Sequence, residues 1–210
     1  MKKIVVFGAS GGTGHHIVEQ ALEAGYQVTA FVRSPKKLDL QHEKLTVFQG
    51  DVMDVDKVDR AIAGQDAVLS ALGPTRPPVP GMMEVAAKNI VGAMDKHGIK
   101  RIISTTGGGV RDPQDQPKLF DHIMKGLLTL MAGTVLKDSE ANVNIIRASD
   151  LDWTIIRYPR LLDDPFTGKY RIGYVGVNSG SQLSRADGAD AVLKELESGE
   201  YLHKMPIVSY

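Results

Sequence analysis

The sequence predicts an α/β protein with a doubly wound, mainly parallel sheet and helices on both faces. Two observations predict this class. Short continuous apolar runs alternate with stretches of helical periodicity, and a glycine-rich turn follows the first apolar run directly. Continuous apolar runs are typical of parallel strands, because helices bury both faces of a parallel sheet. The length of 210 residues suits one domain, so we expect a single unit over residues 1–210.

The periodicity places seven strands and six helices along the chain. The predicted strands cover residues 4–7, 28–32, 45–48, 67–71, 101–104, 153–156 and 205–208. The predicted helices cover residues 14–23, 55–63, 82–97, 118–132, 136–147 and 184–196. Gly25 and Gly98 follow two of these helices as C-terminal stops. Ser184 is expected to cap the last helix, with Asp187 as the acidic member of a capping box.

Composition excludes several classes of function. The 25 basic side chains balance 25 acidic ones, which argues against non-specific nucleic-acid binding and against a polybasic membrane protein. The absence of cysteine excludes disulfides, thiolate nucleophiles and cysteine-ligated metals, and the histidines show no metal-binding spacing. No apolar run approaches the ~20 residues of a membrane span. We therefore expect a cytoplasmic protein without metal, a monomer or weak homodimer that binds a small molecule.

The segment GASGGTG at residues 8–14 connects the first strand to the first helix. Gly8, Gly11 and Gly14 follow the spacing of a dinucleotide fingerprint: the first permits a tight turn, the second lets a pyrophosphate approach, and the third lets helix and strand pack closely. The helix N-terminus adds free N–H groups for phosphate. Ser10 and Thr13 are candidate hydroxyl donors, or simple turn residues. This context predicts a Rossmann-like NAD(P) site.

Arg33 and Ser34 end the second strand, where NAD enzymes place a carboxylate for the ribose 2′-hydroxyl. A guanidinium at this place suits a 2′-phosphate, so NADPH or NADP is favoured over NAD. Lys36 and Lys37 would strengthen the positive charge. The alternative is an ordinary exposed arginine at a strand end.

The ends of the third and fourth strands offer further cofactor contacts. Asp51 and Val52 are placed to receive adenine, although a carboxylate after a strand is commonly only a helix cap. Leu72 and Gly73 are placed beside the inner ribose and nicotinamide.

The proton-donating Tyr-x-x-x-Lys pair of carbonyl-reducing short-chain dehydrogenases is absent, since no tyrosine is followed by lysine four residues later. Either the protein binds a dinucleotide without turnover, or its substrate accepts hydride without a tailored acid. Flavins and bilins fit the second case, because they spread the incoming charge over a conjugated system.

We expect the substrate pocket to be formed by the loops 73–82, 105–118 and 158–182. Thr106 is the candidate hydroxyl contact and the candidate catalytic group. The glycines that follow it, from Gly107, indicate close ligand approach or a turn. Arg160 could meet a propionate or phosphate of the substrate, or face solvent.

Several segments together resemble the biliverdin-IXβ reductase/flavin reductase group of the atypical short-chain dehydrogenases, with an NAD(P)H-binding, NmrA-like fold. They are residues 8–14, 31–34, 50–52, 63–68, 89–94, 159, 164–168 and 210. The resemblance implies NADPH-dependent reduction of flavins or bilins. It implies phosphate contacts at Gly8, Ser10, Gly11, Thr13 and Gly14, the 2′-phosphate at Arg33 and Ser34, and adenine contact at Asp51 and Val52. It also implies the nicotinamide side at Leu72 and Gly73 and the pocket at Thr105, Thr106 and Pro159. We expect Gly12, Thr105 and Pro159 to contact the cofactor as well, and Thr106, Gly107 and Arg160 to contact the substrate. The family's mammalian reductase has a serine in place of Gly107 and a histidine in place of Arg160.

The leading hypothesis is therefore an NADPH-dependent reductase of FMN, riboflavin or bilins. The rival is an NmrA-like NADP(H) sensor that signals by binding a partner. A third option, a sugar-nucleotide epimerase or dehydratase, would need the missing tyrosine and a larger second domain.

Overall fold

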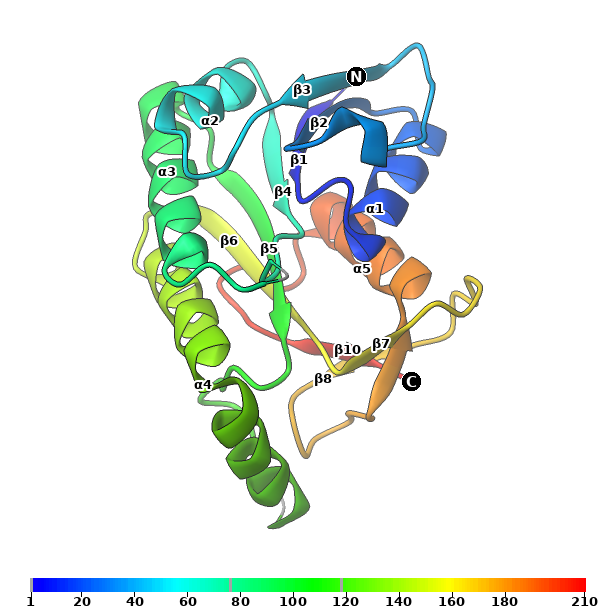
Figure 1. The fold of residues 1–210 in the computed structure, drawn as a ribbon. Helices are drawn as coiled ribbons and strands as arrows, with labels where there is room; N and C mark the ends of the chain where they lie inside the picture. Colours follow the sequence, from blue (N-terminus) through cyan, green and yellow to red (C-terminus); the bar gives the residue numbers. More distant parts are fainter. Residues whose placement is uncertain (1, 76, 118) are drawn as a thin grey trace.

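The protein is built around one eight-stranded sheet with the order β3-β2-β1-β4-β5-β6-β10-β8 (Figure 1). The computed structural model describes residues 2–75, 77–117 and 119–210, with the backbone path alone for residues 119–132. The strands of this sheet are β1 (Lys3–Phe7), β2 (Gln27–Val32), β3 (Leu45–Gln49), β4 (Ala67–Ser70), β5 (Arg101–Gly107), β6 (Asp152–Tyr158), β8 (Arg171–Gly173) and β10 (Ile207–Ser209). All neighbours pair in parallel except β10 and β8. The predicted mainly parallel sheet is confirmed.

Helices cover both faces of the sheet (Figure 1). They are α1 (Gly12–Glu23), the 3-10 turn η1 (Pro35–Lys37), α2 (Val55–Ile62), α3 (Met82–His97), α4 (Leu119–Arg147) and α5 (Arg185–Ser198). α1 packs against α5 on one face, while α3 packs between α2 and α4 on the other. Within the described residues, no helix is long and apolar enough to cross a membrane.

The first strand shows why its sequence is continuously apolar. Ile4 and Val6 belong to the apolar cluster under α1 and α5, whereas Val5 and Phe7 belong to the cluster under α2 and α3. All four side chains are fully buried, because successive residues of a strand point to opposite faces and helices cover both. One short segment therefore supports both layers of the core.

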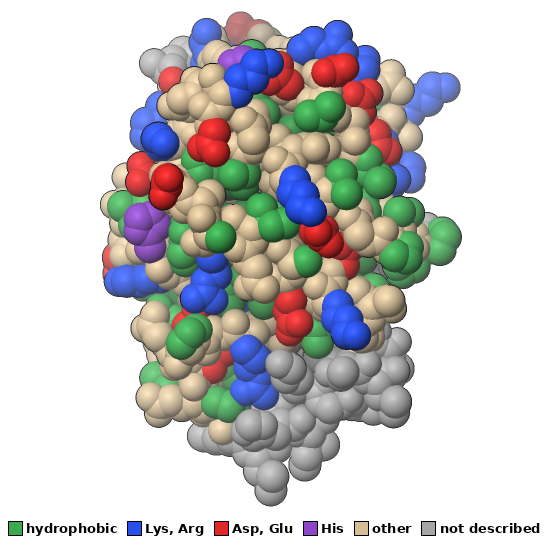
Figure 2. Space-filling view, turned by 90° about the vertical axis from the view of Figure 1, so that its left-hand side faces the viewer, with side chains coloured by type: hydrophobic (Ala, Val, Ile, Leu, Met, Phe, Trp, Pro, Cys, Tyr) green, Lys and Arg blue, Asp and Glu red, His purple; other side chains and the backbone are tan. Residues whose placement is uncertain are grey.

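The charges show the balance that the composition predicts. On the face that carries α2 and α3, basic and acidic side chains are interspersed among the coloured residues (Figure 2). Positive and negative side chains are therefore mixed on this face, as the zero formal charge of the whole sequence suggests.

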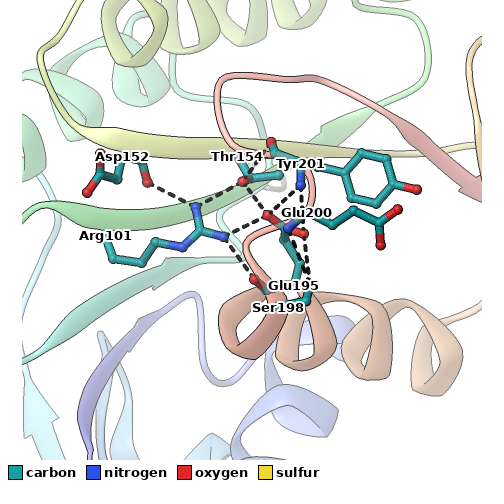
Figure 3. A network of polar contacts seen from close by, with 7 residues as sticks. All are labelled: Arg101, Asp152, Thr154, Glu195, Ser198, Glu200 and Tyr201. Carbon is teal, nitrogen blue, oxygen red and sulfur yellow. Dashed lines mark hydrogen bonds and ion pairs between the residues drawn. The ribbon is translucent and has the colours of Figure 1, made fainter.

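A polar network joins α5 to the sheet (Figure 3). Arg101, the first residue of β5, donates from Nη2 to Glu195 Oε1 at 2.8 Å and from Nη1 to Thr154 Oγ1 at 2.9 Å. Thr154 in turn donates to Glu195 Oε1 at 2.8 Å, and the backbone N–H of Tyr201 donates to the same carboxylate. Because Arg101 begins its strand, this network stands at the opposite end of the sheet from the carboxyl ends of the strands.

Several predicted boundaries are wrong. The two helices predicted at 118–132 and 136–147 are the single helix α4, and Lys118 lies outside the described residues. Gly133 weakens a helix by about 1 kcal/mol relative to alanine without being able to end it alone. β5 continues three residues further than predicted, because it pairs with β6 up to Gly107 and Tyr158.

Three short strands lie where the sequence predicts none or only a pocket loop. β8 adds an antiparallel edge to the main sheet, and β7 (Arg160–Leu162) pairs with β9 (Gln182–Ser184) in a separate two-stranded sheet. Strands of three residues carry too few side chains to show a period.

The start of α5 is partly as predicted. Ser184 caps the helix by accepting from the N–H of Asp187 at 3.0 Å. The second half of the predicted capping box is wrong, because the N–H of Ser184 donates to the Tyr210 hydroxyl at 3.1 Å. The Asp187 carboxylate instead accepts hydrogen bonds from Tyr210, Thr167 and Gly168, and so fixes the loop before β8.

Candidate functional site

A cavity of about 760 Å³ opens at the carboxyl ends of the parallel strands. Each of the six strands from β1 to β6 contributes a residue at or just beyond its end. These residues are Gly8, Arg33, Asp51, Leu72, Thr106 and Pro159. Ligands of doubly wound sheets bind at this edge, where the order of the strands reverses between β1 and β4. The fold therefore brings together residues that lie up to 151 positions apart in the sequence.

The glycines of the turn after β1 are required by close backbone contacts. Gly8 has φ +76°, and a Cβ there would lie 2.5 Å from the carbonyl oxygen of Ala71. A Cβ on Gly14 would collide with the carbonyl of Gly8. Gly14 is not among the residues that line the cavity, and its close contact with Gly8 corresponds to the packing role of the third glycine.

The N-terminus of α1 opens onto the same turn. Its N-cap is Gly11, and no side chain of the described residues caps it. The first N–H groups of a helix have no partner inside the helix, so those of α1 are available to a ligand in the cavity. Ser10, Gly11, Gly12 and Thr13 all line the cavity beside them. This part of the site can hold a pyrophosphate.

A basic corner follows β2. Arg33, Ser34 and Lys37 line the cavity, and the guanidinium of Arg33 has no hydrogen-bond or ion-pair partner among the described residues. Lys36 is not among the lining residues. An unpaired guanidinium beside a hydroxyl and an ammonium suits a phosphate monoester.

Asp51 and Val52 line the cavity next to this corner. Asp51 accepts from the N–H of Met53 at 2.9 Å and does not cap α2. The cap is Asp54, whose Oδ1 accepts from the N–H groups of Asp56 and Lys57 at 3.1 Å each. The alternative that Asp51 serves as a helix cap is therefore wrong.

The far end of the cavity is formed by Leu72, Gly73, Thr105, Thr106, Gly107 and Pro159. A Cβ on Gly107 would meet no described atom within 4 Å, so this glycine leaves open space toward a ligand. Gly108, the next residue, instead packs against the backbone of Tyr158, to whose carbonyl it donates at 2.6 Å. The glycine run therefore combines an open wall with a tight turn.

A second cavity of about 610 Å³ adjoins the first. The two share Pro74, Gly107, Ser139, Tyr158 and Pro159. Its other walls come from residues 108–111, Val135, Leu136, Arg160, Val175, residues 179–181 and Ile207. The charged residues on these walls are Arg111 and Arg160, and neither has a charged or hydrogen-bonded partner among the described side chains.

The three loops expected around the substrate all reach this second cavity, and α4 contributes to it as well, which the sequence does not predict. Val135, Leu136 and Ser139 line it from that helix. Asp138, beside them, accepts from the N–H groups of Met83 and Glu84 at 3.1 Å each, and so caps α3 from another helix. No local signal reveals such a cap, since its two partners lie 54 and 55 residues away.

Tyr158 lines both cavities, but its hydroxyl is occupied. The hydroxyl donates to the carbonyl of Gly188 in α5 at 2.7 Å. Burial raises the pKa of Tyr158 far above its ordinary value. The hydroxyl hydrogen of Tyr158 is therefore directed into the protein, toward α5.

Comparison with known proteins identifies the family. Residues 8–198 match the protein family described as NAD(P)H-binding, which is nearly the whole chain. The chain belongs to this family.

Relatives cover the chain to different extents. The "Uncharacterized protein YwnB" of Bacillus subtilis is 29% identical over 95% of this chain and 94% of its own length. Cinnamoyl-CoA reductase 1 of Petunia hybrida is 28% identical over 55% of this chain, but the match spans 38% of that enzyme.

Solved structures share the fold. A short-chain dehydrogenase/reductase from Veillonella parvula in complex with NADP superposes with a TM-score of 0.80 at 20% identity, covering 100% of this chain and 94% of that one. ChuY, an anaerobilin reductase from Escherichia coli O157:H7, superposes with a TM-score of 0.78 at 21% identity, covering 99% and 97%.

Proposed function

We propose that this NAD(P)H-binding protein is an NADPH-dependent reductase that transfers hydride to a flavin, a bilin or a similar conjugated acceptor. One observation carries the proposal: two cavities meet at Gly107 and Pro159, one with the features of a dinucleotide site and one with apolar walls. A nicotinamide at the junction would face an acceptor in the second cavity. The proposed unit is the whole of residues 1–210.

The residues of the first cavity fit a dinucleotide. The turn around Gly8 is closed by backbone contacts that exclude a Cβ, and the N-terminus of α1 presents unpaired N–H groups. The dinucleotide supplies a hydride when it is bound, and the protein has to bind and orient the dinucleotide. In this arrangement Ser10, Gly11 and Thr13 hold the pyrophosphate, and Thr105 and Pro159 position the nicotinamide end.

Arg33 and Ser34 support NADPH over NADH. The guanidinium of Arg33 has no partner among the described residues, and it stands where a carboxylate would be expected in an NAD enzyme. The structure from Veillonella parvula, which shares the fold, is a complex with NADP.

The second cavity supports a flat, partly anionic acceptor. Its walls include Val110, Leu136 and Ile207, and its charged residues are Arg111 and Arg160. The apolar walls suit a conjugated ring system, and arginine suits a carboxylate or phosphate group. ChuY, which shares the fold, is described as reducing a bilin. Hydride and a proton from solvent together reduce such an acceptor, so no side-chain acid is needed.

The test is a steady-state assay that follows NADPH absorbance with FMN, riboflavin and biliverdin as acceptors. We expect NADPH to be consumed only when an acceptor is present, and NADH to be used less efficiently. Binding of NADPH without turnover of any acceptor would refute the reductase and indicate the NADP(H) sensor. Thr106→Val tests the Thr106 hydroxyl separately. An unchanged kcat would show that this hydroxyl is not a catalytic group.

A further inference from the structure

Arg185, the first residue of α5, lies across the phosphate loop. A Cβ built on Gly12 would stand 2.6 Å from its Cδ and 2.6 Å from its Nε. The side chain therefore runs directly over the first residue of α1, and it also lines the first cavity. Two segments that are more than 170 residues apart in sequence meet at the place proposed for the pyrophosphate.

Helix electrostatics do not favour an arginine at this position. The N-terminal end of a helix carries partial positive charge, and basic side chains are favoured at the other end. Arg185 is nevertheless largely shielded, with 28% of its side chain exposed. Residues that contradict a local rule without structural gain are typical of functional sites.

The existing partner of Arg185 does not account for its place. Nη1 donates to Asp163 Oδ1 at 2.6 Å, and the Asp163 side chain is 88% exposed. Ion pairs with so exposed a carboxylate contribute little to stability. Nε and Nη2 have no hydrogen-bond partner among the described residues, so most donors of the guanidinium remain free beside the open N-terminus of α1.

We infer that Arg185 is a phosphate-binding residue, and that its guanidinium exchanges the Asp163 carboxylate for a pyrophosphate oxygen when a dinucleotide binds. The inference rests on the proposed use of the first cavity. A pyrophosphate held between the N–H groups of α1 and Arg185 interacts with the positive end of the α1 dipole and with the charged guanidinium that α5 carries. Asp163 is then a competing anion, and its exposure to water makes the exchange inexpensive.

The test compares two ligands by isothermal titration calorimetry on the full chain. NADP⁺ carries both a pyrophosphate and a 2′-phosphate, whereas adenosine 2′-monophosphate carries the 2′-phosphate alone. For Arg185→Gln we expect NADP⁺ affinity to fall about tenfold, as for loss of one charged hydrogen bond, with adenosine 2′-monophosphate binding unchanged. For Asp163→Asn we expect NADP⁺ affinity to rise, because the competing anion is gone.

Equal NADP⁺ affinity of Arg185→Gln and wild type would overturn the inference. An equal loss for both ligands would also overturn it, because the arginine would then act on the whole site. A fall in NADP⁺ affinity for Asp163→Asn would overturn the exchange, since Asp163 would then hold the arginine in place. Arg185→Lys, which keeps the charge, is expected to retain intermediate affinity, and thermal melting checks that each variant folds. If wild type binds neither ligand, the proposed function fails as well.

Discussion

Removing the carboxylate of Asp115 tests how the wall of the second cavity is held. Arg157 in β6 is fully buried, and it donates from Nη1 and Nη2 to the two oxygens of Asp115 at 2.7 Å each. The same arginine donates to the carbonyls of Val110 and Met205. Asp115 also accepts from the N–H of Val175 at 3.0 Å. Val110 and Val175 both line the second cavity, so this ion pair stands directly behind its wall.

The magnitude follows from burial. The side chains of Arg157 and Asp115 are 0% and 2% exposed, so Asp115→Asn leaves a buried guanidinium without its counter-charge. Breaking one partner of a buried ion pair costs about 3–5 kcal/mol. In a protein of this size each kcal/mol lowers the melting temperature by about 2–4 °C, so we expect a fall of about 6–20 °C. The acceptor KM should rise, while NADPH affinity should stay near that of wild type.

Thermal melting followed by circular dichroism, together with acceptor kinetics, measures both effects. Lys88→Gln is the matched control, because its ion pair with Glu84 has a similar distance of 2.6 Å but side chains that are 61% and 43% exposed. Loss of that pair should cost only about 0.3–0.5 kcal/mol. If Asp115→Asn melts as Lys88→Gln does, burial does not determine the cost of breaking the Asp115–Arg157 ion pair.

Three further outcomes are expected. Arg33→Asp should lower the affinity for NADP⁺ relative to NAD⁺ at least about tenfold, and an unchanged ratio in titrations would remove the 2′-phosphate site from this corner. Replacing Arg111 and Arg160 together by glutamine should lower kcat/KM for FMN more than for uncharged riboflavin; equal losses would mean that the arginines do not select anionic acceptors. Acid should destabilise the fold as the pH falls below about 4. At Asp115 and Asp187 burial raises the pKa, but hydrogen bonds from their partners lower it more. Both pKa values therefore lie below the ordinary carboxyl value. The stability that a lowered carboxyl pKa contributes is complete above its unfolded value and is lost below it, so a melting temperature that stays constant from pH 6 to about pH 3 would contradict this.

The sequence was informative where a structure depends on neighbouring residues. The helix predicted at 82–97 has the observed bounds Met82–His97, because its period is long and Gly98 ends it with φ +67°. The glycine turn after β1 was equally readable, since its spacing reflects contacts within a single βα unit. The parallel pairing of the strands also follows from such units, because a helical crossover connects parallel strands.

What the sequence missed depends on contacts between distant segments. Nothing in the local sequence distinguishes Arg185 from other helix residues, because its contact with Gly12 forms only in the fold. The spacing predicts Asp187 as the acid of a capping box, yet its carboxylate accepts hydrogen bonds from Thr167 and from the distant Tyr210. The contribution of α4 to the second cavity was unpredictable for the same reason, because only packing decides which of its turns faces a ligand.

The cap that Asp138 provides for α3 limits how the site can be redesigned. The next residue, Ser139, lines both cavities, while Asp138 holds the end of α3 whose first residues, Met82 and Met83, line the first cavity. One turn of α4 thus supports the walls of both cavities at once. Changes here made to admit a larger acceptor should also alter NADPH affinity. Changes at Val135, one turn earlier, offer a way to alter acceptor range separately.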